Sequence, residues 1–218
     1  MPRPRLIHFK GALFHITARG VDKKNIFLDT KDCSRYLERL GKVKKEKKFS
    51  LFSYCLMPNH IHLLIQVNKT PISRIMQALQ TGHTMFYNKK YDHKGHVFQE
   101  RYYCILVEKE SYLMELSRYI HLNPKRAGLE KEVGDYPWSS YDEILNGAKN
   151  PLVEREEILA FFSDKKEKQV PKFEEFVKGG IDIKRDEIFS EVVRDYLLGS
   201  EKFVKLMEKR LVQQEVQG

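Results

Sequence analysis

Residues 57–65 read Met57-Pro58-Asn59-His60-Ile61-His62-Leu63-Leu64-Ile65, and the fold is predicted from the turn within them. The residues before the turn, 49–57, are rich in Phe and Tyr, and the residues after it, 60–67, form a second run suited to a strand. Because the turn formers Pro58-Asn59 separate these two runs, the stretch predicts a β-hairpin.

Working outward from the hairpin, we expect one strand and one helix before it, and a strand between two helices after it. The predicted elements are a strand at 12–18, helices at 30–48 and from 71 through 86, a strand at 102–107, and a helix at 108–122 that Pro124 stops. The order β-α-β-β-α-β, followed by a helix, predicts an α+β fold of the ferredoxin-like kind. In that fold a four-stranded antiparallel sheet carries helices on one face.

A run of turn formers, Asn146-Gly147-Ala148-Lys149-Asn150-Pro151, separates this region from the rest of the chain. We therefore expect one domain at residues 1–146 and a small helical C-terminal extension at 151–218. The spacing of apolar residues predicts helices within the extension at 152–162, 173–177, 183–197 and 201–212.

Positive charge is concentrated in the first two-thirds of the sequence. The 218 residues include 39 Lys and Arg against 30 Asp and Glu, a formal net charge of +9. Residues 151–218 hold 13 basic and 15 acidic side chains, so residues 1–150 hold 26 basic and 15 acidic, a net charge of +11. This asymmetry favours an anionic partner such as nucleic acid. A lysine-rich solvated surface would give the same count.

Composition excludes several protein classes. With 41% hydrophobic residues, the chain can bury a core. The sequence contains neither an apolar run near the roughly 20 residues that cross a bilayer nor a signal-peptide core, so a soluble cytoplasmic protein without a membrane partner is expected. The three cysteines include no CxxC pair, which argues against a disulfide framework or a zinc site.

His60 and His62 are candidate metal ligands. Side chains alternate along a strand, so these two imidazoles point to the same face while Ile61 and Leu63 point to the other. Two imidazoles can share a divalent cation, but a third ligand must come from elsewhere. The alternative is a pair of partly exposed strand histidines without a metal.

The helix before Pro124 carries a candidate nucleophile. Tyr119 and Asn123 are four residues apart and share one helix face, so a phenol and an amide lie side by side. Tyr112, two turns earlier, is the rival nucleophile, whereas His121 lies on another face. Tyr119 could instead be a core aromatic residue, with Asn123 a cap near the helix end.

Together these motifs resemble the single-tyrosine HUH transposases, including the REP-associated tyrosine transposases. The resemblance covers about residues 1–145 and rests on residues 3–5, 57–64, 95–101 and 119–124. It implies that His60 and His62 bind a divalent metal (Mg²⁺ or Mn²⁺), with Asn123 at the position of a third ligand. It also implies that Tyr119 on the catalytic helix attacks single-stranded or hairpin DNA through a 5′-phosphotyrosine, so that the enzyme cleaves and rejoins strands.

DNA binding is assigned to basic residues of the same region. The candidates are Arg3, Arg5, Arg19, Arg101, Lys125 and Arg126. A non-catalytic DNA-binding protein or repressor on the same fold remains an alternative function. A relaxase or replication initiator is disfavoured, because those enzymes usually carry more metal histidines than the single His-Ile-His here. A homodimer is left open.

Overall fold

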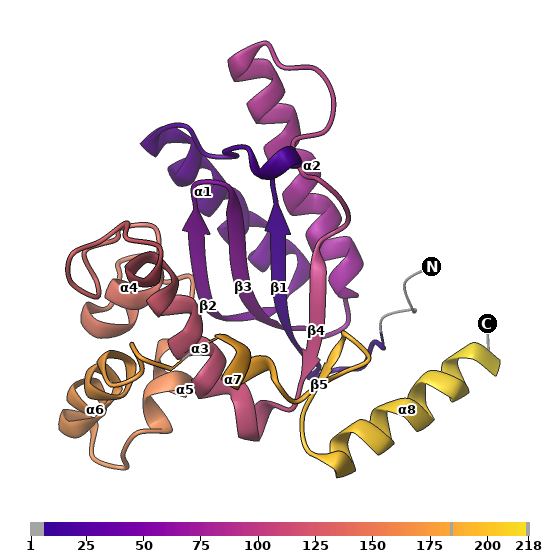
Figure 1. Ribbon diagram of the computed structural model, residues 1–218, viewed down its shortest axis with the longest axis vertical. Coiled ribbons are helices and arrows are strands. Elements are labelled where there is room, and N and C mark those ends of the chain that lie inside the picture. The colour runs from indigo at the N-terminus through magenta and orange to yellow at the C-terminus, as the bar shows by residue number, and fades with distance from the viewer. Residues whose placement is uncertain (1–6, 184, 217–218) are drawn as a thin grey trace.

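The computed structural model of the chain describes residues 7–183 and 185–216 and confirms the predicted element order. Its first part contains β1 (Leu13–Arg19), the short 3-10 helix η1 (Val21–Lys23), α1 (Thr30–Lys47), β2 (Ser50–Met57), β3 (His60–Gln66), α2 (Ile72–Tyr91), β4 (Tyr103–Val107) and α3 (Lys109–Arg126). Figure 1 shows these strands side by side, with β1 at the middle of the sheet.

The sheet has the strand order β2-β3-β1-β4-β6-β5. Strand β1 is antiparallel to both β3 and β4, and its register places Thr17 opposite His62 and Arg19 opposite His60. Since directly opposed residues in a sheet point to the same face, His60, His62 and Thr17 share one face with His15, two residues before Thr17. The alternating residues, among them Ile61, are buried on the other face.

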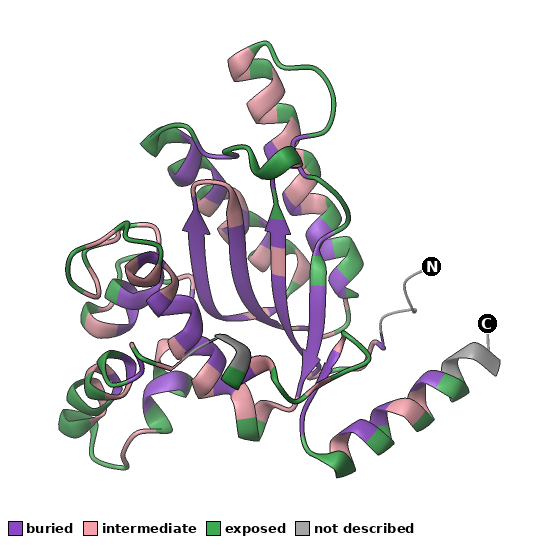
Figure 2. Ribbon diagram, viewed as in Figure 1, coloured by how far each residue is buried: buried purple, intermediate pink, exposed green. Residues whose placement is uncertain are grey.

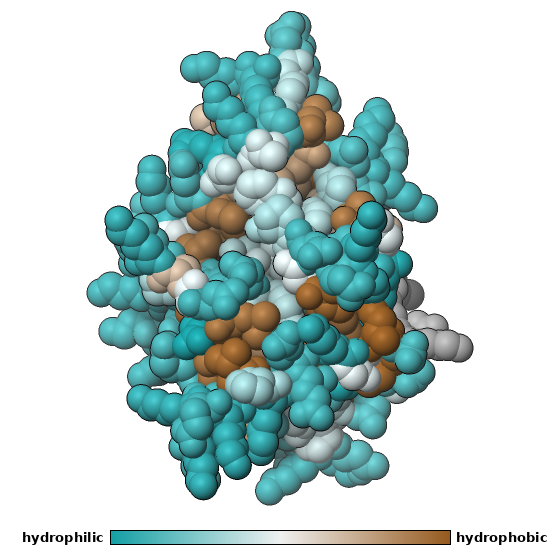
Figure 3. All heavy atoms as spheres, turned by 90° about the vertical axis from the view of Figure 1, so that its left-hand side faces the viewer, coloured by the Kyte–Doolittle hydropathy of each residue, from teal (hydrophilic) through white to brown (hydrophobic). Residues whose placement is uncertain are grey.

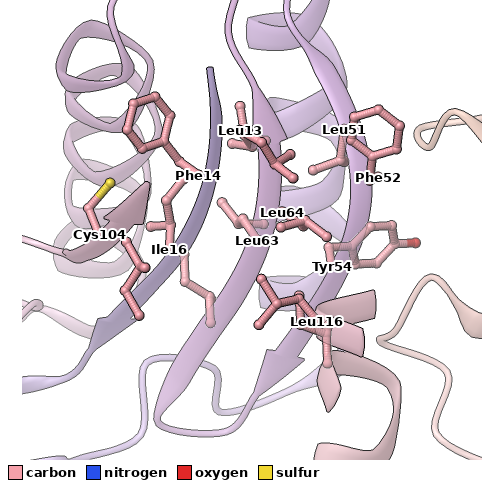
Figure 4. Packing of buried hydrophobic residues seen from close by; sticks show 14 of the residues in the cluster. Leu13, Phe14, Ile16, Leu51, Phe52, Tyr54, Leu63, Leu64, Cys104 and Leu116 are labelled. Carbon is pink, nitrogen blue, oxygen red and sulfur yellow. The ribbon is translucent and has the colours of Figure 1, made fainter. Parts of the chain in front are cut away.

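The two faces of the sheet are covered by different helices. Helices α1 and α2 lie together behind the sheet in Figure 1, and Arg39 of α1 donates hydrogen bonds to the carbonyl of Ala78 in α2. Helix α3 packs against β2 and β3 on the histidine face, where the hydroxyls of Ser53 and Ser117 lie 2.7 Å apart. Figure 4 shows side chains from β1 to β4 and Leu116 of α3 in one apolar core.

Helix α3 is longer than the sequence predicted. It continues through Pro124 to Arg126 rather than stopping before the proline. Its end is set by Gly128, which has a φ of 69°. The amide of Gly128 bonds to the carbonyl of Lys125, and that of Leu129 to the carbonyl of Pro124, which is the Schellman pattern. Pro124 has no amide hydrogen to donate to the carbonyl of Ile120, so α3 continues past it with one backbone hydrogen bond fewer.

The outer edge of β2 is covered by residues 136–140. The amide of Leu56 donates to the carbonyl of Trp138 at 2.8 Å, and the hydroxyl of Tyr136 donates to the carbonyl of Leu56 at 2.7 Å. Trp138 is partly buried and packs against the core, which anchors this segment beside β2. Covering the edge satisfies backbone groups that would otherwise be open to pairing with another chain.

The C-terminal part contains more than helices. Its elements are α4 (Tyr141–Asn146), α5 (Arg155–Ala160), α6 (Lys166–Lys178), α7 (Arg185–Phe189), β5 (Val192–Val193), β6 (Leu197–Leu198) and α8 (Glu201–Val216). The prediction of one helix at 183–197 is wrong beyond residue 189. Arg194 and Asp195 adopt positive φ and form a tight turn, so β5 and β6 pair antiparallel, and β6 adds in parallel to β4.

The strands are buried along most of their length, whereas the helices alternate between buried and exposed positions (Figure 2). Figure 3 shows the side that carries α4 and α6 as mainly hydrophilic, with separate hydrophobic patches. No helix in the described ranges has the length and apolar character of a membrane span. The division between residues 146 and 151 stays a prediction.

Gly128→Ala should destabilise the protein by about 1–2 kcal/mol, because an L side chain is strained at this positive φ. A Cβ at this position would have open space around it, so backbone strain is the whole effect. Chemical denaturation of the variant measures the change. The matched control is Gly128→Asn, which tolerates the left-handed conformation better and should lose less. Equal losses for the two variants would contradict this explanation of the helix end.

Candidate active site

The histidine face of the sheet forms the floor of a cleft of about 550 Å³. The cleft lies between β1, β3 and β4, the 99–101 segment, α3 and α7. The side chains around it are those of His15, Thr17, Ala18, Arg19, His60, His62, Gln99, Glu100, Arg101, Tyr103, Ile105, Tyr119, Asn123 and Phe189. The predicted ligands and the predicted nucleophile therefore meet in one place.

His60 lies at the start of β3, directly after the turn, and is partly buried. The Asn59 side chain donates through Nδ2 to the carbonyl of Lys23, which leaves its Oδ1 as the acceptor 2.6 Å from His60 Nδ1. His60 therefore carries its proton on Nδ1 and its lone pair on Nε2. Burial, helped by the nearby Arg19 charge, lowers the pKa of His60 to about 4. The imidazole is thus neutral at neutral pH, which is the form that binds metals.

His62 lies two residues further along β3 and is 4% exposed. Two groups from β1 approach its Nδ1 atom. They are the Nε2 atom of His15 and the hydroxyl of Thr17, each at 3.2 Å. The rings of His15 and His62 are nearly parallel, with centroids 5.4 Å apart.

Tyr119 comes from α3 and lies over the two buried histidines. Its ring is edge-on to His62, with centroids 5.6 Å apart, and to His15, at 6.0 Å. Phe189 of α7 packs edge-on against Tyr119 at 5.1 Å and stacks on His15 at 5.5 Å. Tyr119 is only 5% exposed as a result.

Asn123 lies one turn after Tyr119 and lines the same cleft. Its Nδ2 donates to the carbonyl of Tyr119 at 2.7 Å, so its amide oxygen remains as an acceptor. Within the described part of the chain, no three His, Cys, Asp or Glu side chains are grouped as a metal cluster. His60, His62 and Asn123 bring two imidazoles and an amide oxygen to the cleft, which are donor types that divalent cations bind.

The sequence pattern of the family described as "Transposase IS200 like" matches residues 9–123, which is more than half of the chain. The chain belongs to this family. The match includes β1, the His60-Ile61-His62 strand and most of α3, so it spans the elements that form the cleft.

Two further comparisons agree with the IS200-like assignment. A protein of Haemophilus influenzae named as a REP-associated tyrosine transposase is 26% identical over 144 residues, covering 61% of this chain and 81% of that protein. A solved structure of a REP-associated tyrosine transposase bound to a REP hairpin matches with a TM-score of 0.58 and 19% identity, covering 70% of this chain and 90% of that one. The second likeness supports the α+β fold.

The basic residues assigned to DNA binding fall into three groups. Arg19 and Arg101 line the cleft of this IS200-like chain. Lys125 donates to the carbonyl of Lys131, and Arg126 donates to the carbonyls of Gly180 and Ile183, so both hold loops in this structure. Arg3 and Arg5 lie outside the described residues.

The two alternatives on α3 lie away from the cleft. The hydroxyl of Tyr112 donates to Glu191, and Tyr112 lines a separate pocket beside α7. His121 is buried 2.8 Å from the Ser140 hydroxyl, and burial lowers its pKa to about 3. Its position on another face of α3 agrees with the spacing argument.

Sequence reasoning missed three residues of the cleft. The sequence indicates for His15 and Thr17 only that they belong to a strand, and their alternation with Ile16 places them on the histidine face once the register is known. Phe189 gave no signal, because its position depends on how the C-terminal segment returns to the sheet.

Phe189→Ala should make Tyr119 more accessible, since Phe189 covers the tyrosine ring. Nitration by tetranitromethane, mapped by mass spectrometry, should increase severalfold at Tyr119. The matched control is Phe161→Ala, which removes an aromatic ring that is already 51% exposed. Unchanged nitration of Tyr119 in the Phe189 variant would show that this ring does not shield it.

Proposed function

We propose that this protein is a transposase that cleaves and rejoins single-stranded DNA, in hairpin form, by attack of Tyr119 on a phosphodiester. The observation that carries the proposal is the position of the Tyr119 ring, edge-on to His62 in a cleft that also holds His60 and Asn123. All four residues line this one cleft. All four also fall within the predicted catalytic domain, residues 1–146.

His60, His62 and Asn123 are the residues that would hold a divalent cation, either Mg²⁺ or Mn²⁺. Both imidazoles lie on one face of β3, and Asn123 provides the oxygen donor that these hard cations favour. A bound cation would polarise the scissile phosphate as a Lewis acid. The chain's own contribution is to hold the two histidines in fixed orientations through Asn59, Thr17 and His15.

In the covalent step, the phenolic oxygen of Tyr119 forms a bond to phosphorus while the bond from phosphorus to the 3′ oxygen breaks. The leaving 3′ oxygen takes up a proton, the phenol loses one, and the products are a 5′-phosphotyrosine and a free 3′-OH. Because the phosphotyrosine keeps the phosphodiester energy, attack by another 3′-OH reverses the step and joins new strands. No nucleotide cofactor is consumed.

DNA binding is assigned to the basic side of the cleft. Arg19 and Arg101 flank it, and a net charge of +11 over residues 1–150 favours the approach of a polyanion. The related REP-associated tyrosine transposase is bound to a REP hairpin in its solved structure, which supports a hairpin as the substrate form.

Tyr119→Phe should abolish the covalent protein–DNA adduct, because the variant lacks the attacking oxygen. Tyr112→Phe, the matched control on the same helix, should form the adduct at the wild-type level, since Tyr112 faces Glu191. The measurement is denaturing gel electrophoresis after incubation with a labelled single-stranded hairpin and Mn²⁺.

Adduct formation by the Tyr119 variant together with its loss in the Tyr112 variant would reverse the assignment. If the wild-type protein binds the hairpin but gives no adduct under these conditions, the non-catalytic DNA-binding alternative is favoured.

Arg101→Ala should weaken hairpin binding and lower the slope of log Kd against log salt concentration by about 1, as expected for one lost phosphate contact. Lys125→Ala is the control, because Lys125 is held by the carbonyl of Lys131 and should leave the slope unchanged. Fluorescence anisotropy at several salt concentrations gives both slopes. If the slope changed more in the Lys125 variant than in the Arg101 variant, the result would place the bound DNA near the end of α3 rather than in the cleft.

A further inference from the structure

His15 and Thr17 project from β1 toward one atom of His62. The His15 Nε2 atom and the Thr17 hydroxyl both lie 3.2 Å from His62 Nδ1. Neither residue belongs to the His-Ile-His motif or to α3. Their position follows from the register, in which Thr17 is directly opposite His62 and His15 is the diagonal neighbour.

The contact at His62 parallels the contact at His60. Asn59 Oδ1 can only accept, so it fixes the His60 proton on Nδ1. At His62 the same nitrogen faces protein groups, but these groups can either donate or accept. The direction of the hydrogen bond between His62 and β1 is therefore linked to the tautomer of His62.

The direction of that hydrogen bond decides whether His62 can bind a metal through Nε2. If Nδ1–H donates to His15 or Thr17, the lone pair lies on Nε2. If His15 or Thr17 donates to Nδ1, the proton of a neutral His62 lies on Nε2 and blocks ligation there. A hydrogen bond from the His62 Nδ1–H to His15 or Thr17 and metal binding at Nε2 thus favour each other. The second nitrogen of a metal-bound histidine usually donates to such an acceptor.

We propose that His15 and Thr17 are positioning residues that together hold His62 in its Nδ1–H form and so prepare its Nε2 for a divalent cation. The inference rests on the proposed metal site. His15 suits this task because it is 3% exposed and its ring is fixed between the rings of His62 and Phe189. Since both acceptors serve one proton, either one partly replaces the other.

The test is the affinity for Mn²⁺, measured by electron paramagnetic resonance without DNA. The double variant His15→Phe, Thr17→Val keeps an aromatic ring against Phe189 and a β-branched residue in the strand, but it removes both acceptors. We expect its Kd for Mn²⁺ to rise by about 10–100-fold. Each single variant should raise the Kd by a smaller factor. The product of the two single factors should be less than the factor for the double variant, because each acceptor partly replaces the other.

The outcomes separate this inference from the proposed function. A folded double variant that binds Mn²⁺ as tightly as wild type would overturn the role of His15 and Thr17 while leaving the metal site intact. If wild-type protein has no Mn²⁺ site that His60→Ala weakens, the metal site itself fails and this inference fails with it.

A second measurement does not depend on how the variants fold. Long-range ¹H–¹⁵N spectra of metal-free wild-type protein report the tautomer of each neutral histidine. We expect His62 in the Nδ1–H form. The Nε2–H form in the wild-type protein would overturn the proposal.

Discussion

The pairing of β1 with β3 is the constraint on which the site depends. Side chains alternate along a strand, so a slip of β3 by one residue would turn His60 and His62 to the opposite face of the sheet. In the observed register, His60 and His62 face α3 together with His15 and Thr17. Ile61 and its alternating neighbours then complete the apolar face under α1 and α2, and this burial is what penalises a slipped register.

The second requirement is the placement of α3 over this face. The Ser53–Ser117 contact and the apolar packing around Leu116 hold the helix against β2 and β3. Gly128 ends the helix only after Pro124, so Asn123 is still within regular helix and shares a face with Tyr119. The site therefore combines a ligand pair fixed by a sheet with a nucleophile fixed by a helix.

Much of this arrangement could be predicted from local sequence. The hairpin, the helices and the alternation of His60 and His62 follow from short-range patterns, as does the shared face of Tyr119 and Asn123. Features that depend on distant contacts could not be predicted. Pro124 is a strong stop signal in isolation, yet Gly128 sets the end of α3. Likewise β6 forms against the edge of β4, and β5 pairs with β6 in turn.

The same limit applies to the site. Spacing alone kept Tyr112 as a rival, and only the fold places it beside Glu191 and away from the cleft. His15 and Thr17 become part of the site through a register that the sequence does not show. Lys125 and Arg126 are predicted DNA contacts in the sequence, and only the fold shows that both also hydrogen-bond to backbone carbonyls of loops.

The central claim is that Tyr119 is the residue that becomes joined to DNA. Trypsin separates the two candidate tyrosines, because cleavage after Arg118 leaves Tyr112 on the peptide 110–118 and Tyr119 on the peptide 119–125. Mass spectrometry of the trapped adduct, after nuclease trimming, measures which peptide carries the nucleotide. We expect the nucleotide mass on the peptide 119–125. The same mass on the peptide 110–118, or on any other peptide, would contradict the claim.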